Sequence, residues 1–250
     1  MHEIADPIAC IDCPLQDCPG LRPLEEHQLV FMQGFKEGEV ALARGELLIS
    51  EGRSHQQLYT LLGGVLIRWR SLDDGRRQIV NFMFPGDLVG LQSAFDEPAA
   101  HAVEALVDAR LCRFPRGRFT ELIASHPGLG YDITWLAAQE ETALEGHIVS
   151  LGQRSARERV AYLAVWLIDR ARATCLADDG NRVGLPITQV QIADMLGLSL
   201  VHTNRTLRQL LREGLVEWRS REIRIPDLDH TAEFAQYRSE EHTSELQSPS

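Results

Sequence analysis

The sequence lacks the long apolar runs and the leader pattern that mark exported or membrane-spanning proteins. Its apolar runs are far shorter than the roughly 20 residues that a membrane-spanning helix requires. The first residues, MHEIADPIAC, contain neither a basic start nor an apolar stretch, so they do not resemble a signal peptide. We therefore expect a cytoplasmic protein without a membrane partner.

The motifs of the common enzyme classes are missing as well. The chain has no Gly-x-Ser-x-Gly elbow, no His-Glu-x-x-His zinc motif and no glycine-rich loop of the kind that cradles phosphates. We therefore expect that the protein is not an enzyme and has no catalytic residues.

Cysteine is scarce, with five residues in a chain of 250. Three of them lie within the stretch CIDCPLQDC: Cys10, Cys13 and Cys18. Pro14 and Pro19 keep this stretch from forming a helix. In a reducing compartment, close thiols more often bind a metal or react than form structural disulfides. The stretch therefore suggests a metal-ligand set that needs a fourth member, and zinc is one metal that prefers tetrahedral sulfur and Cys-x2-Cys pairs. The alternative is a group of redox-reactive thiols without a metal.

Acidic residues outnumber basic ones, and the formal net charge of −11 argues against a uniformly basic nucleic-acid binder. The charge is unevenly spread along the chain. Residues 1–150 carry 12 basic and 22 acidic side chains, whereas residues 151–229 carry 12 and 10. A nucleic-acid partner must therefore be sought in the second region.

Short apolar runs separated by Gly, Pro and Asp fill residues 30–128. Runs of this length and punctuation are typical of antiparallel strands in a jelly roll. An Asp-Gly pair in SLDDGRRQ, residues 71–78, predicts a β-hairpin between two of the runs. We predict an antiparallel β-roll as a sensor domain over this region.

A helical pattern follows over residues 129–152. Its apolar residues form one stripe: Ile133, Leu136, Ala137, Leu144, Ile148 and Leu151. Such a stripe packs either against its own domain or against the same helix of a second subunit. Ser155 and Glu158 form a capping box that predicts the start of the next helix, which places a domain boundary near residues 152–155.

Two short helices joined by a glycine turn are predicted toward the C-terminal end of the chain. Thr188 is the expected N-cap of the first, Leu196–Gly197 forms the turn, and the second begins after Ser199. The stretch GLVEWRSREIRIPD then predicts a β-hairpin wing with Arg219 and Arg221 near its tip. This arrangement is a winged helix-turn-helix.

The second of these helices has two distinct faces. Its apolar stripe is Thr203, Leu207, Leu210 and Leu211, and its outer face carries Val201, Asn204, Arg205, Arg208 and Arg212. Arg can bind both acceptors of a guanine in the major groove, and Asn can bind adenine in the same way. The outer face therefore predicts binding to double-stranded DNA, and the alternative is a basic face that meets only solvent. The predicted DNA contacts are Thr188, Gln189, Val201, His202, Asn204, Arg205, Arg208 and Arg212, the first two on phosphate.

The order of β-roll, long helix and winged helix resembles the CRP/FNR family of bacterial transcription regulators over about residues 10–230. The motifs that carry the resemblance are FPGDLVGL, residues 84–91, and ITQVQIADMLGLSLVHTNRTLRQLLREGLV, residues 187–216. It implies a homodimer on a palindromic promoter site that works with RNA polymerase. The long helix would form the dimer seam through Ile133, Leu136, Leu144, Ile148 and Leu151.

The oxygen-sensing FNR branch of that family holds a [4Fe–4S] cluster on three N-terminal cysteines and a fourth in the roll. The matching residues here are Cys10, Cys13, Cys18 and Cys112, with the second gap one residue shorter than in that branch. The resemblance thus implies a sensor of oxygen, nitric oxide or redox state. The alternative is a regulator without a cluster, which senses thiol redox state or another ligand in the roll. Cys175 is interpreted as incidental.

Other relatives in the family bind cyclic AMP in the roll, but the residues that do so differ here. Leu91 occupies the place of an acidic residue, and residues 99–101, Ala-Ala-His, occupy the place of the Arg-Ser pair that binds the phosphate. A buried phosphodiester without a cation or hydroxyl partner is costly, so we expect no cyclic nucleotide.

The resemblance also bears on the DNA sequence that is read. Val201, Asn204 and Arg205 align with the Glu, Ser and Arg by which the FNR branch reads its site. Only the Arg is retained, which predicts a different half-site.

The predicted fold class is α+β. The predicted domains are a cysteine-containing segment (1–29), the β-roll (30–128), the dimerisation helix (129–152), the winged helix-turn-helix (153–230) and a tail (231–250). The last part of the tail, SEEHTSELQSPS, resembles read-through of sequencing-adapter DNA.

Overall fold

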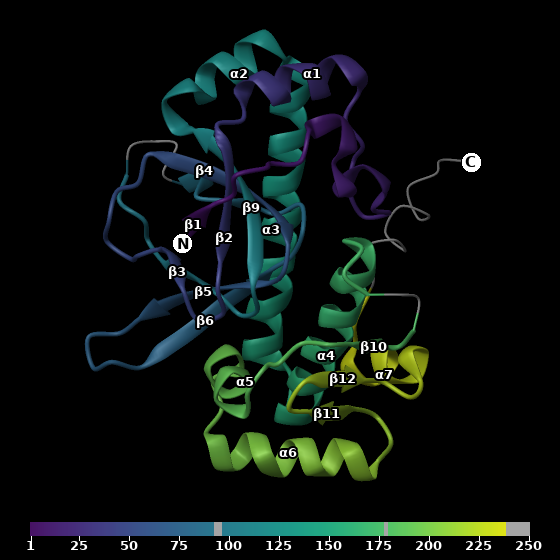
Figure 1. The fold of residues 1–250 in the computed structure, drawn as a ribbon. Helices are drawn as coiled ribbons and strands as arrows, with labels where there is room; N and C mark the ends of the chain where they lie inside the picture. The colour runs from purple at the N-terminus through teal and green to yellow at the C-terminus, as the bar shows by residue number, and fades with distance from the viewer. Residues whose placement is uncertain (93–96, 178–179, 239–250) are drawn as a thin grey trace. The chain divides into compact units, whose positions relative to one another are not determined.

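The computed structural model describes residues 1–92, 97–177 and 180–238. These residues belong to two compact units (Figure 1). The first unit holds Met1–Glu145 and Ala173–Leu176, and the second holds Gly146–Arg172 and the chain from Ala177 onward.

The first unit is built around two antiparallel sheets, as the spacing of the apolar runs predicted. One sheet has the order β1-β2-β9-β4-β7 and the other has the order β3-β8-β5-β6. The strands are β1 (His2–Glu3), β2 (Gly38–Leu42), β3 (Leu47–Ile49), β4 (Gln57–Gly63), β5 (Leu66–Ser71), β6 (Arg77–Met83), β7 (Leu88–Val89), β8 (Ala102–Ala105) and β9 (Ala109–Pro115). Residues from both sheets, among them the fully buried Leu61, Leu66 and Leu111, share one core. This arrangement confirms the predicted β-roll.

The Asp-Gly pair forms the predicted hairpin between β5 and β6. Ser71 pairs with Arg77 next to the turn, and Gly75 within the turn has a φ of 84°, a conformation that favours glycine. Asp74 accepts a hydrogen bond of 3.0 Å from the backbone N–H of Arg76. Local turn chemistry therefore fixes the register of these two strands.

Helices lie at one end of the roll, and the sequence did not predict the first of them. α1 (Glu26–Phe35) and α2 (Phe119–Ser125) lie together at the top of Figure 1. Two short 3-10 helices, η1 (Cys10–Asp12) and η2 (Pro14–Asp17), precede α1. The prediction that the roll begins at residue 30 is wrong, because α1 occupies residues 26–35. The continuous run Leu-Val-Phe-Met conceals the helical period, in which Leu29 is buried and Val30 is exposed.

The long helix α3 runs over Pro127–Gln153, which confirms the predicted helix and extends it by two residues at the N-terminal end and one at the C-terminal end. Proline suits the first turn of a helix, because its missing N–H would have no partner there. The two units divide inside α3, between Glu145 and Gly146, whereas the sequence placed a boundary near residues 152–155. A Cβ on Gly146 would lie 2.3 Å from the Tyr162 hydroxyl, so this glycine allows α3 and the next helix to approach closely.

The second unit contains the predicted helix-turn-helix and wing. Its elements are α4 (Ala156–Ala173), β10 (Arg182–Val183), α5 (Gln189–Leu196), α6 (Leu200–Arg212), β11 (Glu217–Arg219), β12 (Glu222–Arg224) and α7 (Leu228–Ala235). Glu158 accepts a hydrogen bond of 2.7 Å from the backbone N–H of Ser155, so the predicted capping box is present. Thr188 caps α5, and Gly197 ends it with a φ of 62°. Local signals therefore predicted both ends of α5 correctly.

Helix α7 extends the second unit beyond residue 230, where the sequence ended the domain. Thr231 is fully buried, and its hydroxyl donates a hydrogen bond of 3.1 Å to the carbonyl of Leu215. Asp227 caps the helix by accepting from the backbone N–H of His230. The prediction of a tail over 231–250 is therefore wrong for its first part, and residues 239–250 lie outside the described residues.

Within the part of the chain that the structure describes, none of the helices is both long enough and apolar enough to cross a membrane.

Candidate DNA-binding surface and cysteine cluster

The buried face of α6 differs from the predicted stripe at two positions, Thr206 and Leu211. Thr203, Thr206, Leu207 and Leu210 are buried, whereas Leu211 is 53% exposed. Spacings of three and four residues from Thr203 lead to 206, 207 and 210, so position 211 lies off that face. The sequence prediction included Leu211 because it is apolar and omitted Thr206 because it is polar.

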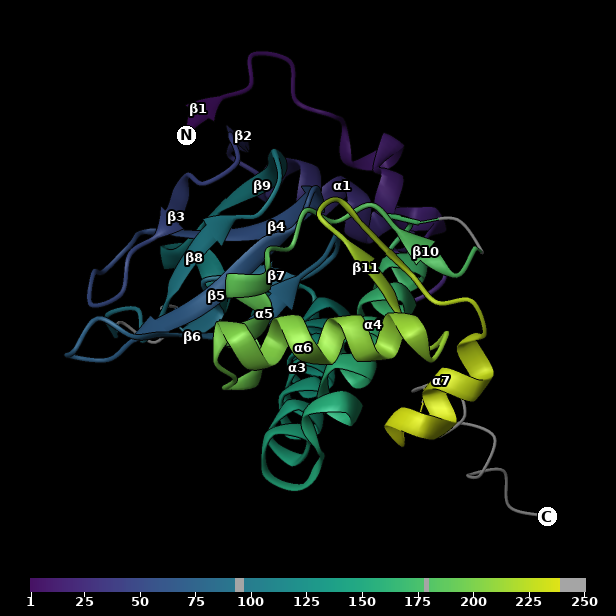
Figure 2. The same ribbon diagram turned by 90° about the horizontal axis from the view of Figure 1, so that it is seen from below.

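The opposite face of α6 is exposed and basic, as predicted. Val201 is 81% exposed, and Arg205, Arg208 and Arg212 are exposed as well. Among the described residues, none of these three guanidinium groups has an ion-pair or hydrogen-bond partner. Helix α6 lies at the outer edge of its unit (Figures 1 and 2). The exposure of these side chains leaves the face accessible to a ligand. A row of unpaired arginines on an exposed helix is suited to the phosphates and base edges of DNA.

The N-terminal end of α5 lies beside this face. Asn204 Nδ2 donates a hydrogen bond of 2.9 Å to Oε1 of Gln189, so two of the predicted contact residues are joined. Thr188 is engaged in the cap of α5, where its hydroxyl accepts from the backbone N–H of Gln191. His202 is half-buried at the start of α6, one turn from the Ser199 cap.

The wing forms the predicted hairpin. β11 and β12 pair antiparallel, with Arg219 opposite Glu222, and β10 extends the sheet. Arg219 and Arg221 are both exposed near the turn. Arg219 lies 3.5 Å from Glu217, so one of the two wing arginines is partly neutralised.

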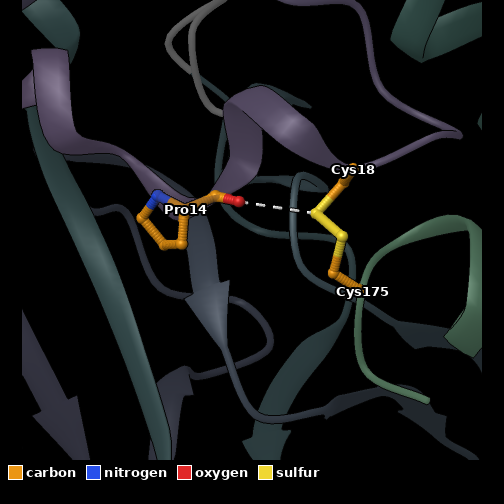
Figure 3. Close-up of a disulfide and its surroundings, with 3 residues drawn as sticks. All are labelled: Pro14, Cys18 and Cys175. Carbon is orange, nitrogen blue, oxygen red and sulfur yellow. Dashed lines mark hydrogen bonds between the residues drawn. A yellow bond between two sulfur atoms is a disulfide. The ribbon is translucent and has the colours of Figure 1, made fainter. Parts of the chain in front are cut away.

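The five cysteines fall into two groups, and this differs from the predicted ligand set. Cys18 forms a disulfide with Cys175, and the Cα atoms of the pair are 5.4 Å apart. Figure 3 shows the bond between the N-terminal segment and the stretch that follows α4. The interpretation of Cys175 as incidental is therefore wrong. A pairing between positions 157 residues apart has no local sequence signal.

The other three cysteines line one cavity in the first unit. Cys10, Cys13 and Cys112 are free thiols at the wall of a largely apolar space of about 190 Å³. Burial raises the pKa of all three thiols, and it raises that of Cys112 to about 12. The ammonium of Lys36 acts in the opposite direction on each. The thiols are therefore neutral at physiological pH, and a nearby cation is available to any thiolate that forms.

This arrangement can be compared with the needs of a four-thiolate cluster. Three of the four predicted ligands share the cavity, but the sulfur of Cys18 is bonded to Cys175. In residues 1–92, 97–177 and 180–238, no three His, Cys, Asp or Glu side chains gather closely enough to hold a metal ion. As placed here, the residues do not fit a [4Fe–4S] cluster.

A buried ionic group anchors the N-terminal segment next to these thiols. Glu39 is fully buried and accepts from Lys36 Nζ at 2.5 Å, from Arg110 and from the backbone N–H of Ile8 at 2.9 Å. Lys36 also donates to the carbonyl of Ile8 at 2.6 Å. Burial lowers the pKa of Lys36, but the hydrogen bond to Glu39 and the neighbouring charges outweigh it and leave the pKa raised. This group has no local sequence signal, because Ile8 and Arg110 lie far in sequence from Lys36 and Glu39.

The residues predicted for the dimer seam do not all face outward. Ile133 and Leu136 line the cavity of their own unit, because the first half of α3 covers the roll. Ile148 is 67% exposed, and Leu144 and Leu151 are half-buried. The surface left for a partner helix therefore centres on the second half of the predicted stripe.

Comparisons with known proteins agree with this architecture. A cyclic nucleotide-binding domain model matches residues 39–126, and a Crp-like helix-turn-helix domain model matches residues 158–232. The chain is 34% identical over 209 residues to the nitrogen fixation regulation protein FixK of Bradyrhizobium diazoefficiens. The matched region covers 83% of this chain and 85% of FixK. It is 27% identical over 219 residues to the transcriptional activator protein FnrL of Cereibacter sphaeroides, 86% and 87% of the two chains.

Solved structures give the same result. The structure of FixK2 from Bradyrhizobium japonicum superposes with a TM-score of 0.68 at 28% identity, covering 78% of this chain and 95% of FixK2. These relatives are transcription regulators, which confirms the expectation that the chain is not an enzyme. Helix-turn-helix regulators of this kind bind DNA and act as dimers. The chain therefore belongs to the CRP/FNR family and is a DNA-binding transcription regulator of that type.

Proposed function

We propose that the protein controls transcription as a cytoplasmic homodimer on a palindromic DNA site, where it works with RNA polymerase, and that the state of its cysteines sets DNA binding. The DNA-binding part is supported by the unpaired arginines on α6. The sensing part is supported by the disulfide of Cys18 with Cys175 and by three further thiols in the same unit.

Dimerisation gives the two recognition helices that a palindromic site requires. The exposed Ile148 and the half-buried Leu144 on α3 are the residues through which a partner helix would pack. Both half-sites bind tightly only if the two subunits share one geometry, so a small change at the seam has a large effect on affinity. A change of cysteine state in the sensor unit would act through this geometry.

The proposed signal is reversible oxidation of Cys18 and Cys175. Hydrogen peroxide accepts two electrons: one thiolate attacks an oxygen to give a sulfenic acid and water, and the second thiol displaces water from that sulfur. Two thiols and one peroxide thus give one disulfide and two waters. In the reduced form, the Cys18 thiol can donate a hydrogen bond to the carbonyl oxygen of Pro14, which lies 3.6 Å from Sγ (Figure 3).

A second candidate is the [4Fe–4S] sensor of oxygen or nitric oxide. The observation that favours it is the position of Cys10, Cys13 and Cys112 around one cavity. It requires that Cys18 leave Cys175 and turn toward that cavity. Zinc bound by the same four cysteines would also require Cys18 to leave Cys175.

The experiment that separates these candidates is a count of iron, zinc, acid-labile sulfide and thiols on protein purified without air, repeated after exposure to peroxide. The disulfide proposal predicts no metal, five thiols before oxidation and three afterward, with a matching change in DNA affinity. About four irons and four sulfides per chain would favour the cluster instead. If DNA affinity does not change with peroxide, air or metal content, the proposal of cysteine sensing is overturned. The proposal of DNA binding would still stand.

The exposed basic face of α6, here the reading face, is tested separately. Arg205→Ala should lower affinity for the specific site by about 1–3 kcal/mol while affecting random DNA less. Arg182→Ala removes an exposed arginine on β10 and serves as the matched control. Equal losses on specific and random DNA would show that Arg205 binds phosphate only.

A further inference from the structure

A hydrogen bond crosses the helix-turn-helix between two amide side chains. Asn204 Nδ2 donates to Gln189 Oε1 over 2.9 Å. Gln189 is the first residue of α5, and Asn204 lies in the second turn of α6. The bond therefore joins the end of one helix to the face of the other that carries the unpaired arginines.

The bond determines which polar atoms of Asn204 remain available. One Nδ2 hydrogen is engaged, which leaves the Oδ1 acceptor and the second Nδ2 hydrogen. An acceptor beside a donor is the pattern that pairs with N6 and N7 of adenine in the major groove. Holding the amide in place before binding reduces the rotational freedom that is lost on contact with the base.

We propose that Gln189 and Asn204 act as one adenine-reading unit, in which Gln189 is a positioning residue for the Asn204 amide. This inference rests on the proposed function, because it requires α6 to lie in the major groove. It changes the role expected of Gln189 from phosphate contact to base selectivity exerted through Asn204.

The local structure makes the unit testable without disturbing the fold. The cap of α5 uses the side chains of Thr188 and Gln191, so a change at Gln189 leaves it intact. Gln189 is also exposed, and its replacement creates no cavity. Gln209, an amide on α6 that bonds to Glu213 and is not among the predicted DNA contacts, provides a control.

The experiment is selection from a randomised double-stranded DNA library with the full-length protein, in reduced and in peroxide-treated form. Wild type should enrich a palindrome with one adenine per half-site that both Asn204→Ala and Gln189→Ala cease to select. In Asn204→Ala, the preference for adenine over the other bases at that position should fall about 5- to 150-fold. The double variant should lose no more than Asn204→Ala alone, because Gln189 acts through Asn204.

Two further measurements separate positioning from phosphate contact. Gln189→Glu keeps an acceptor for Asn204 Nδ2, so it should retain adenine preference even where added charge weakens overall affinity. A 7-deazaadenine at the selected position lacks the N7 acceptor and should weaken wild type while leaving Asn204→Ala unchanged. Gln209→Ala should behave as wild type in every assay.

The outcomes distinguish this inference from the proposed function. If wild type enriches a site and Gln189→Ala loses affinity equally at all sequences, Gln189 contacts phosphate and the inference is overturned. If Gln189→Ala changes nothing, it is overturned as well. If wild type in neither redox form enriches any sequence, the proposed function itself fails.

Discussion

Glu39→Gln should destabilise the first unit more than any ordinary surface change. The Glu39 side chain is fully buried and receives hydrogen bonds from Lys36, Arg110 and the backbone of Ile8. The Lys36 side chain is itself only 3% exposed. The substitution leaves two cations beside a neutral amide, and water cannot reach Lys36 in compensation.

The expected loss follows from this burial. Removing one partner of a buried ion pair costs about 3–5 kcal/mol, because the remaining charge stays desolvated. Glutamine can still accept one of the hydrogen bonds, so we expect the lower end, about 3 kcal/mol. Without Glu39, burial lowers the Lys36 pKa below its unfolded value. The deficit should then shrink as the pH rises toward the ordinary lysine pKa of about 10.4.

Urea denaturation of the full-length protein, followed by circular dichroism and fluorescence, measures the loss. Glu37→Gln is the matched control, since Glu37 is 39% exposed and lies 3.8 Å from Arg113; we expect less than about 1 kcal/mol. Because Glu39 holds Ile8, Glu39→Gln should also hasten proteolysis of the N-terminal segment. Equal stability of the two variants would refute the reasoning.

Three other predictions follow from single positions. Gly64→Ala should cost more than Gly75→Ala, because both have positive φ but only at Gly64 would a Cβ meet backbone, at 2.4 Å; thermal unfolding of both variants checks this. Burial is the main cause that lowers the pKa of His101 to about 4, and the nearby arginines add to it. The folded state is therefore most stable when His101 is neutral. That contribution should be lost as the pH falls from about 6.5 to about 4, and His101→Gln should flatten this part of the stability profile. Ile148→Asp should shift the protein toward monomer in sedimentation and weaken binding to a palindrome more than to a half-site.

The helix-turn-helix was predictable because its signals are local. Thr188, Gly197 and Ser199 specify the ends of α5 and the start of α6 within a few residues, and no distant contact alters them. The error at Leu211 has a local cause too, because the stripe was extended by hydrophobicity rather than by helical angle. A buried threonine such as Thr206 is invisible to a pattern that counts only apolar residues.

The first unit was less predictable because its cysteine pairing and its buried ionic group depend on distant contacts. The Cys18–Cys175 bond and the group around Glu39 join residues from separate elements, and only the folded chain brings them together. Helix α1 was missed for another reason. Its apolar residues are consecutive, a pattern that strands and buried helices share.

Cys18 is the residue at which the two sensing mechanisms exclude each other, because one sulfur cannot bind iron and Cys175 together. Cys175→Ser separates them. A cluster sensor should keep its iron and its response to air in this variant, since Cys175 is not a predicted ligand. If the disulfide is the sensor, this variant should no longer respond to peroxide. It should bind DNA with the affinity of the reduced wild-type protein under all conditions. Cys112→Ser provides the converse, because it removes a predicted ligand and leaves the disulfide intact. A response that survives Cys175→Ser and fails in Cys112→Ser would therefore assign sensing to the cavity thiols, and the opposite pattern would assign it to the disulfide.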